Sequence, residues 1–145
     1  MKVPVITVTQ PYAELMMLGV KKFEMRGWKT TFMGELYIHA SETRDFWALD
    51  LCHDDPSYRK HIADRTKLSF GAIIGKVTIV NVWPWNEAYL GLTHEEQAFC
   101  QYYGPTYNGF AWMLDNPVRI NPIRRQGPGL PGIWHADIKE MEVAL

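Results

Sequence analysis

Hydrophobic and polar residues alternate over several short stretches of this chain, a pattern typical of β-strands that bury one face. The clearest stretches are residues 3–8, 23–26, 34–40 and 71–82. The last is apolar on both faces, and Gly71 and Gly75 would let it bend as strands do at the corners of a barrel. We therefore predict strands over these four stretches.

Three more strands are predicted towards the C-terminus, over residues 109–114, 118–123 and 133–138. The first two are separated by residues 115–117, whose sequence Asp-Asn-Pro is typical of a turn. We therefore expect two separate short strands that are joined at this point.

One helix is predicted directly after the first strand. Pro11 favours a helix start, residues 12–18 are apolar on nearly every side, and Gly19 is a residue type that ends helices. A helix that is apolar all round is buried, so we expect this one to fill part of the core.

Two further helices are predicted from their capping residues, with a short helix and loop between them over residues 54–67. Ser41 is the expected cap of a helix over about residues 44–51. A capping box formed by Thr93 with the glutamate three residues later opens another helix, which we expect to reach about Tyr103.

These elements together predict an α+β fold, a small β-barrel of about six strands with short helices covering its openings. The 145 residues fit a single domain over residues 1–145. Hydrophobic residues make up 47% and charged residues 21% of the chain, which excludes the class of disordered proteins.

The net charge and the lengths of the apolar stretches further limit the classes of protein to which the chain can belong. Lys plus Arg is 15 and Asp plus Glu is 16, a net charge of −1, so any contact with nucleic acid must come from a local basic patch. No stretch approaches the roughly 20 apolar residues of a membrane helix, and the first residues lack the apolar region of a signal peptide. We expect a reduced cytoplasmic protein that does not contact a membrane.

The residues capable of binding metal do not form a recognisable set. Cys52, His53 and His61 lie close in the sequence, but their spacing fits no closed zinc site, and Cys100 is far away. We expect no metal site and no cofactor.

A basic cluster is the clearest candidate for binding. Lys21, Lys22, Arg26 and Lys29 place four cations within nine positions, with Trp28 among them. Basic residues interleaved with an aromatic side chain suit attraction of a phosphate backbone together with stacking on a base. The alternative is a solvated strand edge that carries an ion pair.

Glu24 and Arg26 lie two positions apart on a predicted strand, so their side chains point the same way. A carboxylate beside a guanidinium can hold it in place and still leave N–H donors for a phosphate or a base edge.

Five motifs in this chain resemble, in the same order, those of the ASCH domain family, which is PUA-like. Residues 19–26 (GVKKFEMR) resemble the G-x-K-x-x-E-x-R signature of the family. The other four similar blocks are residues 10–13 (QPYA), 34–41 (GELYIHAS), 71–75 (GAIIG) and 110–112 (FAW). The blocks cover nearly the whole chain.

The resemblance implies a PUA-type β-barrel with a cleft beside the signature that binds RNA or a nucleotide-like ligand. We expect Lys21 and Arg26 to attract phosphate, Glu24 to orient Arg26 or to accept a hydrogen bond from a base or a ribose hydroxyl, and Trp28 to stack on a base. The full set of predicted ligand-binding residues is Gln10, Lys21, Lys22, Glu24, Arg26, Trp28, Lys29, His39 and Ser41.

Two alternatives from other classes of function remain open. Some relatives remove the acyl group of N4-acetylcytidine and others are reported to cleave RNA; in a hydrolase of this kind, Lys21 would be a general base or an oxyanion partner and Glu24 would activate water. The deacylating branch has a threonine where this chain has Glu24, which argues against that activity. The second alternative is a module that binds a protein partner.

Overall fold

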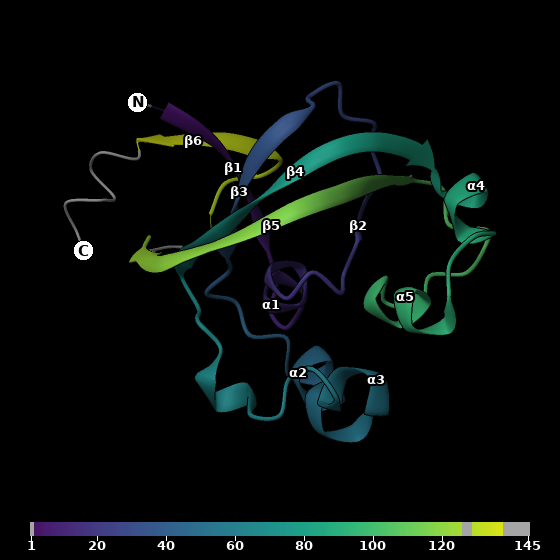
Figure 1. The fold of residues 1–145 in the computed structure, drawn as a ribbon, viewed down its shortest axis with the longest axis horizontal. Coiled ribbons are helices and arrows are strands. Elements are labelled where there is room, and N and C mark those ends of the chain that lie inside the picture. Colours follow the sequence, from purple (N-terminus) through teal and green to yellow (C-terminus); the bar gives the residue numbers. More distant parts are fainter. Residues whose placement is uncertain (1, 126–128, 138–145) are drawn as a thin grey trace.

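The computed structural model describes residues 2–125 and 129–137 and arranges six strands in one sheet (Figure 1). The strands are β1 (Lys2–Val8), β2 (Phe23–Arg26), β3 (Gly34–Ala40), β4 (Ala72–Pro84), β5 (Phe110–Arg124) and β6 (Ile133–Asp137). The helices are α1 (Tyr12–Met17), α2 (Phe46–Asp54), α3 (Pro56–Arg59), α4 (Trp85–Tyr89) and α5 (His94–Phe99), with one 3-10 turn at Arg65–Lys67. The four strands predicted in the first half of the chain are confirmed.

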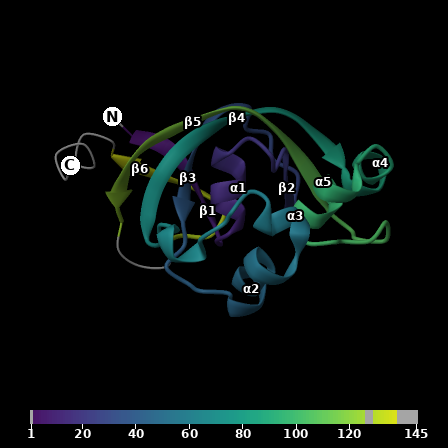
Figure 2. The same ribbon diagram turned by 60° about the horizontal axis from the view of Figure 1, so that its bottom comes forward.

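The sheet is mixed and strongly curved. Its strand order is β2-β5-β4-β3-β1-β6, with β1 and β3 parallel and every other neighbouring pair antiparallel. Figure 2 shows β4 and β5 arching over α1. Among the described strands β2 and β6 are the two edges, so the sheet is barrel-like without closing, and the predicted α+β barrel is confirmed in this open form.

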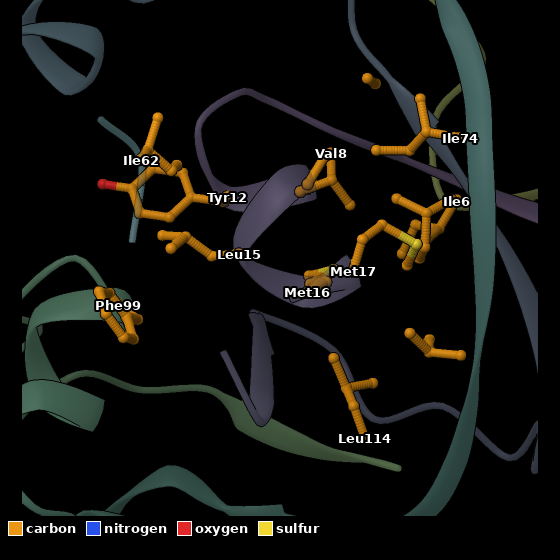
Figure 3. Close-up of a cluster of buried hydrophobic side chains, with 14 of the residues drawn as sticks. Ile6, Val8, Tyr12, Leu15, Met16, Met17, Ile62, Ile74, Phe99 and Leu114 are labelled. Carbon is orange, nitrogen blue, oxygen red and sulfur yellow. The ribbon is translucent and has the colours of Figure 1, made fainter. Parts of the chain in front are cut away.

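The helix α1 fills the core as predicted. Figure 3 shows Met17 reaching towards Ile6 and Ile74 of the sheet, while Leu15 lies on the side of Phe99. Five of the six residues of α1 are buried: Tyr12, Ala13, Leu15, Met16 and Met17. Each buried large apolar side chain contributes roughly 1.5–3 kcal/mol to folding, so this short helix is held by its packing more than by its own hydrogen bonds.

A closed turn at the end of α1 connects this helix to β2. Gly19 has a φ of +77°, the left-handed conformation that glycine adopts without strain. The N–H groups of Val20 and Lys21 both donate to the carbonyl of Leu15, at 3.2 and 3.1 Å. This closed turn fixes where Lys21 leaves the helix and where β2 begins.

The prediction of two strands separated by a turn at residues 115–117 was wrong. β5 is one strand of 15 residues that pairs with β4 along its length. Lys76 and Thr78, two apart on β4, face Val118 and Asp115, three apart on β5. The extra residue is accommodated as a bulge, with Asn116 at a φ of +50°, because the long partner strand keeps the ladder continuous across it.

The predicted cap of α2 was also wrong. Asp45 accepts the N–H of Ala48 at 3.1 Å and caps the helix, which runs to Asp54. The hydroxyl of Ser41 instead accepts the N–H of Thr43 at 3.0 Å, so it stabilises a local turn that precedes the helix.

The capping box at the start of α5 is confirmed, but the helix ends at Phe99 and does not reach Tyr103. Gln101 and Tyr102 have φ angles of +57° and +54°, which a right-handed helix cannot contain. At the C-terminus β6 ends at Asp137, and the last residue of the predicted strand, residue 138, lies outside the described residues.

Candidate ligand-binding site

A cleft with a volume of about 300 Å³ lies where the end of β1 meets β2 and the segment that joins α5 to β5. This volume is at the small end of the range for small-molecule sites, roughly 300–1,000 Å³. The residues that line it are Thr7, Val8, Thr9, Tyr12, Glu24, Met25, Arg26, Gly27, Gln101 and Tyr107.

Arg26 is fixed in the wall of this cleft by two partners. Its Nε and Nη2 donate to Oε2 of Glu24 at 3.1 and 2.7 Å, and Nη2 also donates to the carbonyl of Thr7 at 3.0 Å. The side chain of Arg26 is 24% exposed and that of Glu24 is 10% exposed. Among the described residues Nη1 makes no hydrogen bond, so its two N–H groups are available to a ligand.

Lys21 lies behind Glu24 and not in the lining of the cleft. The residue is 2% exposed, and Nζ donates to the carbonyl of Phe99 at 2.8 Å and lies 3.8 Å from Oε1 of Glu24. The signature therefore comes together in space, but Lys21 itself does not line the cleft. Two cations and one carboxylate leave this group with a net charge of +1.

Two tyrosines form fixed walls. Tyr12 is buried, its hydroxyl lies 3.2 Å from that of Tyr58, and burial raises the pKa of Tyr12 to about 12, so it stays neutral. Tyr107 stacks on Tyr103 with ring centroids 4.3 Å apart and an interplanar angle of 10°. Sequence patterns gave no indication of Tyr107, because the segment before β5 has no periodicity.

Gln10 and His39 are engaged within the protein and do not line the cleft. The amide of Gln10 donates to the carbonyl of Ser69 and accepts the N–H of Glu14, both at 2.9 Å. The imidazole of His39 is fully buried between the hydroxyl of Thr7, at 3.1 Å, and the carbonyl of Arg125, at 3.3 Å. Burial lowers the pKa of His39.

The predicted aromatic platform and the remaining cations lie apart from the lining of the cleft. Trp28 is exposed on one side and packs edge-to-face on Trp112 with ring centroids 4.8 Å apart. Lys22 and Lys29 are both exposed, at either end of β2. Ser41, as described above, takes part in a local turn. The four cations of the sequence cluster therefore do not form one continuous patch.

The metal-capable residues remain separate. Cys52 is buried, His53 bonds to Asp54 at 2.8 Å and His61 bonds to Glu95 at 2.8 Å. Within residues 2–125 and 129–137 no three His, Cys, Asp or Glu side chains converge. In the same part of the chain no helix has the length and apolar character needed to cross a membrane.

Comparison with known proteins identifies the family and the fold of the chain. The model of the ASCH domain matches residues 6–124. Among solved structures, the ASCH protein of Zymomonas mobilis is similar with a TM-score of 0.58 and 15% identity, over 96% of this chain and 90% of that one. Two mutants of that protein give TM-scores of 0.57 and 0.56, also at 15% identity, over 97% of this chain and 94% and 92% of theirs.

No curated protein matches the chain. At 15% identity the likeness to the Zymomonas mobilis structures is one of fold. The family match spans more than half of the chain and includes the signature at residues 19–26. This chain belongs to the ASCH domain family, with its PUA-like fold.

Proposed function

We propose that the cleft binds single-stranded RNA or a nucleotide-like ligand. The observation that carries the proposal is Arg26, which is held rigidly by Glu24 and Thr7 and still presents two N–H groups on Nη1. A guanidinium fixed in this way binds a phosphate at little cost in conformational entropy. Membership of a family whose fold is often used to bind RNA supports the same class of ligand.

The size and lining of the cleft fit one nucleotide unit. A volume of about 300 Å³ is too small for a duplex, and the partly exposed ring of Tyr107 offers aromatic surface beside the charged wall. Single-stranded RNA is recognised by this combination of aromatic contact, phosphate contact and hydrogen bonds to base edges.

The geometry favours binding over hydrolysis. Nζ of Lys21 is buried outside the lining of the cleft and donates to the carbonyl of Phe99, which leaves it poorly placed to take a proton from a ligand. Glu24 has Oε2 occupied by Arg26 and Oε1 facing Lys21, which leaves it poorly placed to activate water.

Substitution of Arg26 tests the proposal. Fluorescence anisotropy with a labelled single-stranded oligoribonucleotide, and calorimetry with nucleoside monophosphates, would be compared for the wild type, Arg26→Ala and Arg124→Ala. We expect Arg26→Ala to lose about 1–3 kcal/mol of binding free energy, the usual size of a charged contact. Arg124 is exposed and outside the cleft, so its variant removes the same charge and should bind normally.

Glu24→Gln separates a binder from an enzyme in the same assay. If Glu24 only orients Arg26, the amide oxygen still accepts and affinity should fall little. Multiple turnover of RNA or of N4-acetylcytidine that drops by about 10²–10⁴ in Glu24→Gln, with binding intact, would instead identify a general base. Equal affinities of Arg26→Ala and Arg124→Ala would refute the proposed site.

A further inference from the structure

We propose that Gln101 is the residue with which this cleft distinguishes one nucleobase from another. The inference rests on the proposed function and extends it, since it assigns the recognition of the nucleobase to Gln101. Gln101 belongs to the segment between α5 and β5, about 75 residues after the Glu24–Arg26 pair in sequence, and it lines the same cleft.

The chemistry of Gln101 suits a base edge. A primary amide presents a donor and an acceptor side by side, which is how Gln and Asn side chains pair with bases. Gln101 is exposed, and among the described residues its amide makes no hydrogen bond. Two other polar side chains of the lining are engaged within the protein: Glu24 bonds to Arg26, and the hydroxyl of Thr7 bonds to His39.

The backbone holds Gln101 in a conformation that needs an explanation. Gln101 and Tyr102 both have positive φ angles, +57° and +54°, which side chains other than glycine adopt at a cost in energy. Such strain persists only where the surroundings impose it, and it is concentrated at ligand-binding positions.

The surroundings that impose this conformation lie immediately after Gln101. The hydroxyl of Tyr102 donates to Oδ2 of Asp55 at 2.6 Å, and the backbone N–H of Tyr102 donates to the carbonyl of Gln97 at 2.9 Å. The next residue, Tyr103, stacks on Tyr107, another residue of the lining. The segment is therefore anchored to α3 and to the cleft wall, and it places the side chain of Gln101 in the lining of the cleft.

Two substitutions separate the amide from the backbone strain. Gln101→Gly removes the amide and also relieves the positive φ, so the variant should melt at the same temperature or higher. Gln101→Asn keeps an amide on a residue type that tolerates the left-handed conformation. If Gln101→Gly loses discrimination between nucleotides, the loss can then not be attributed to unfolding.

Calorimetry with AMP, CMP, GMP and UMP provides the readout. We expect the wild type to bind one of the four at least about tenfold more tightly than another, the discrimination given by one bidentate amide contact. In Gln101→Gly this ratio should fall to near one, while the weakest nucleotide keeps its affinity. Gln101→Asn should retain part of the ratio.

The outcomes distinguish this inference from the proposed function. A wild type that binds all four nucleotides equally, or an unchanged ratio in Gln101→Gly, overturns the role of Gln101. If Arg26→Ala lowers affinity in the same experiment, the proposed function stands and only the role of Gln101 is rejected. A wild type that binds neither the four nucleotides nor single-stranded RNA overturns both.

Discussion

At the scale of single residues, Glu24 connects the two cations of the signature. Its Oε2 accepts both bonds from Arg26, and its Oε1 lies 3.8 Å from Nζ of Lys21. Burying the carboxylate of Glu24 or the ammonium of Lys21 without a partner would be costly. The spacing of the signature therefore has a structural reason, since Glu24 offsets the burial of Lys21, and Lys21 and the partly exposed Arg26 offset the burial of Glu24.

The buried imidazole of His39 makes stability depend on pH. Burial lowers its pKa, so below about pH 6.5, the ordinary value for histidine, the unfolded chain binds a proton more readily than the folded one. The free energy of unfolding of the wild type should therefore fall as the pH drops through this value. In His39→Gln that part of the pH dependence should be absent.

Urea denaturation of both proteins at pH 7.5 and pH 5.5 measures this effect. The quantity of interest is the change in the free energy of unfolding between the two pH values, because other titrating groups are shared and cancel in the comparison. Parallel pH dependence in the wild type and in His39→Gln would contradict the assignment to His39.

At the scale of elements, Lys21 joins α5 to the start of β2. Its ammonium donates to the carbonyl of Phe99, the last residue of α5, 78 positions away in the sequence. Lys21→Met keeps most of the apolar stem and removes the charge, so we expect it to lower the free energy of unfolding by about 1.5–3 kcal/mol, the size of a hydrogen bond to a charged group. Urea denaturation provides the measurement.

The neighbouring lysine is a matched control for that substitution. Lys22 is exposed, so Lys22→Met should change the free energy of unfolding by no more than about 0.5 kcal/mol. Hydrogen exchange gives a second readout: the amides of α5 should lose protection in Lys21→Met and not in Lys22→Met. Equal stability of the two variants would show that the contact with Phe99 contributes nothing.

The elements that were predicted correctly are those whose type and position are determined by their own residues. β2 and β3 follow from alternation, and α1 follows from an apolar run between a proline and a glycine. β5 could not be predicted as one strand, since its continuity through Asn116 depends on the length of its partner β4. The cap of α2 could not be predicted either, because serine and aspartate are both favoured at N-caps. The tertiary structure determines that Asp45, and not Ser41, caps the helix.

The residues of the site could likewise be predicted from the sequence only where a local pattern places them. Glu24 and Arg26 were predicted to act together, because two residues of one strand share a face. The burial of Lys21 was not predictable, since it lies in a turn where strand periodicity does not apply. Gln101 and Tyr107 come from a segment with no periodic pattern, and only the fold brings them to the cleft.

At the scale of the whole molecule, the charge distribution predicts weak and local attraction of RNA. The net charge is −1, and cations outside the signature are partly neutralised, as when both terminal nitrogens of Arg119 bond to Glu14 at 2.8 Å. Arg26 is the partly exposed cation in the wall of the cleft, and Lys22 and Lys29, on either side of β2 in the sequence, are exposed but outside its lining. Long-range attraction of a polyanion by this surface is therefore small.

The dependence of RNA affinity on salt tests this distribution. Each phosphate contacted on a single strand contributes a slope of about −0.7 in a plot of log K against log salt concentration, so about three cations predict a slope near −2. An oligoribonucleotide that extends from the cleft past the end of β2 would reach Lys29, so Lys29→Ala should make the slope shallower by about 0.7, whereas the neutral substitution Trp28→Leu should leave it unchanged. Anisotropy titrations of a labelled single-stranded oligoribonucleotide between 50 and 300 mM salt measure it. Tight binding of a duplex that is insensitive to salt would contradict the arrangement, since neither a cleft of about 300 Å³ nor three separated cations could produce it.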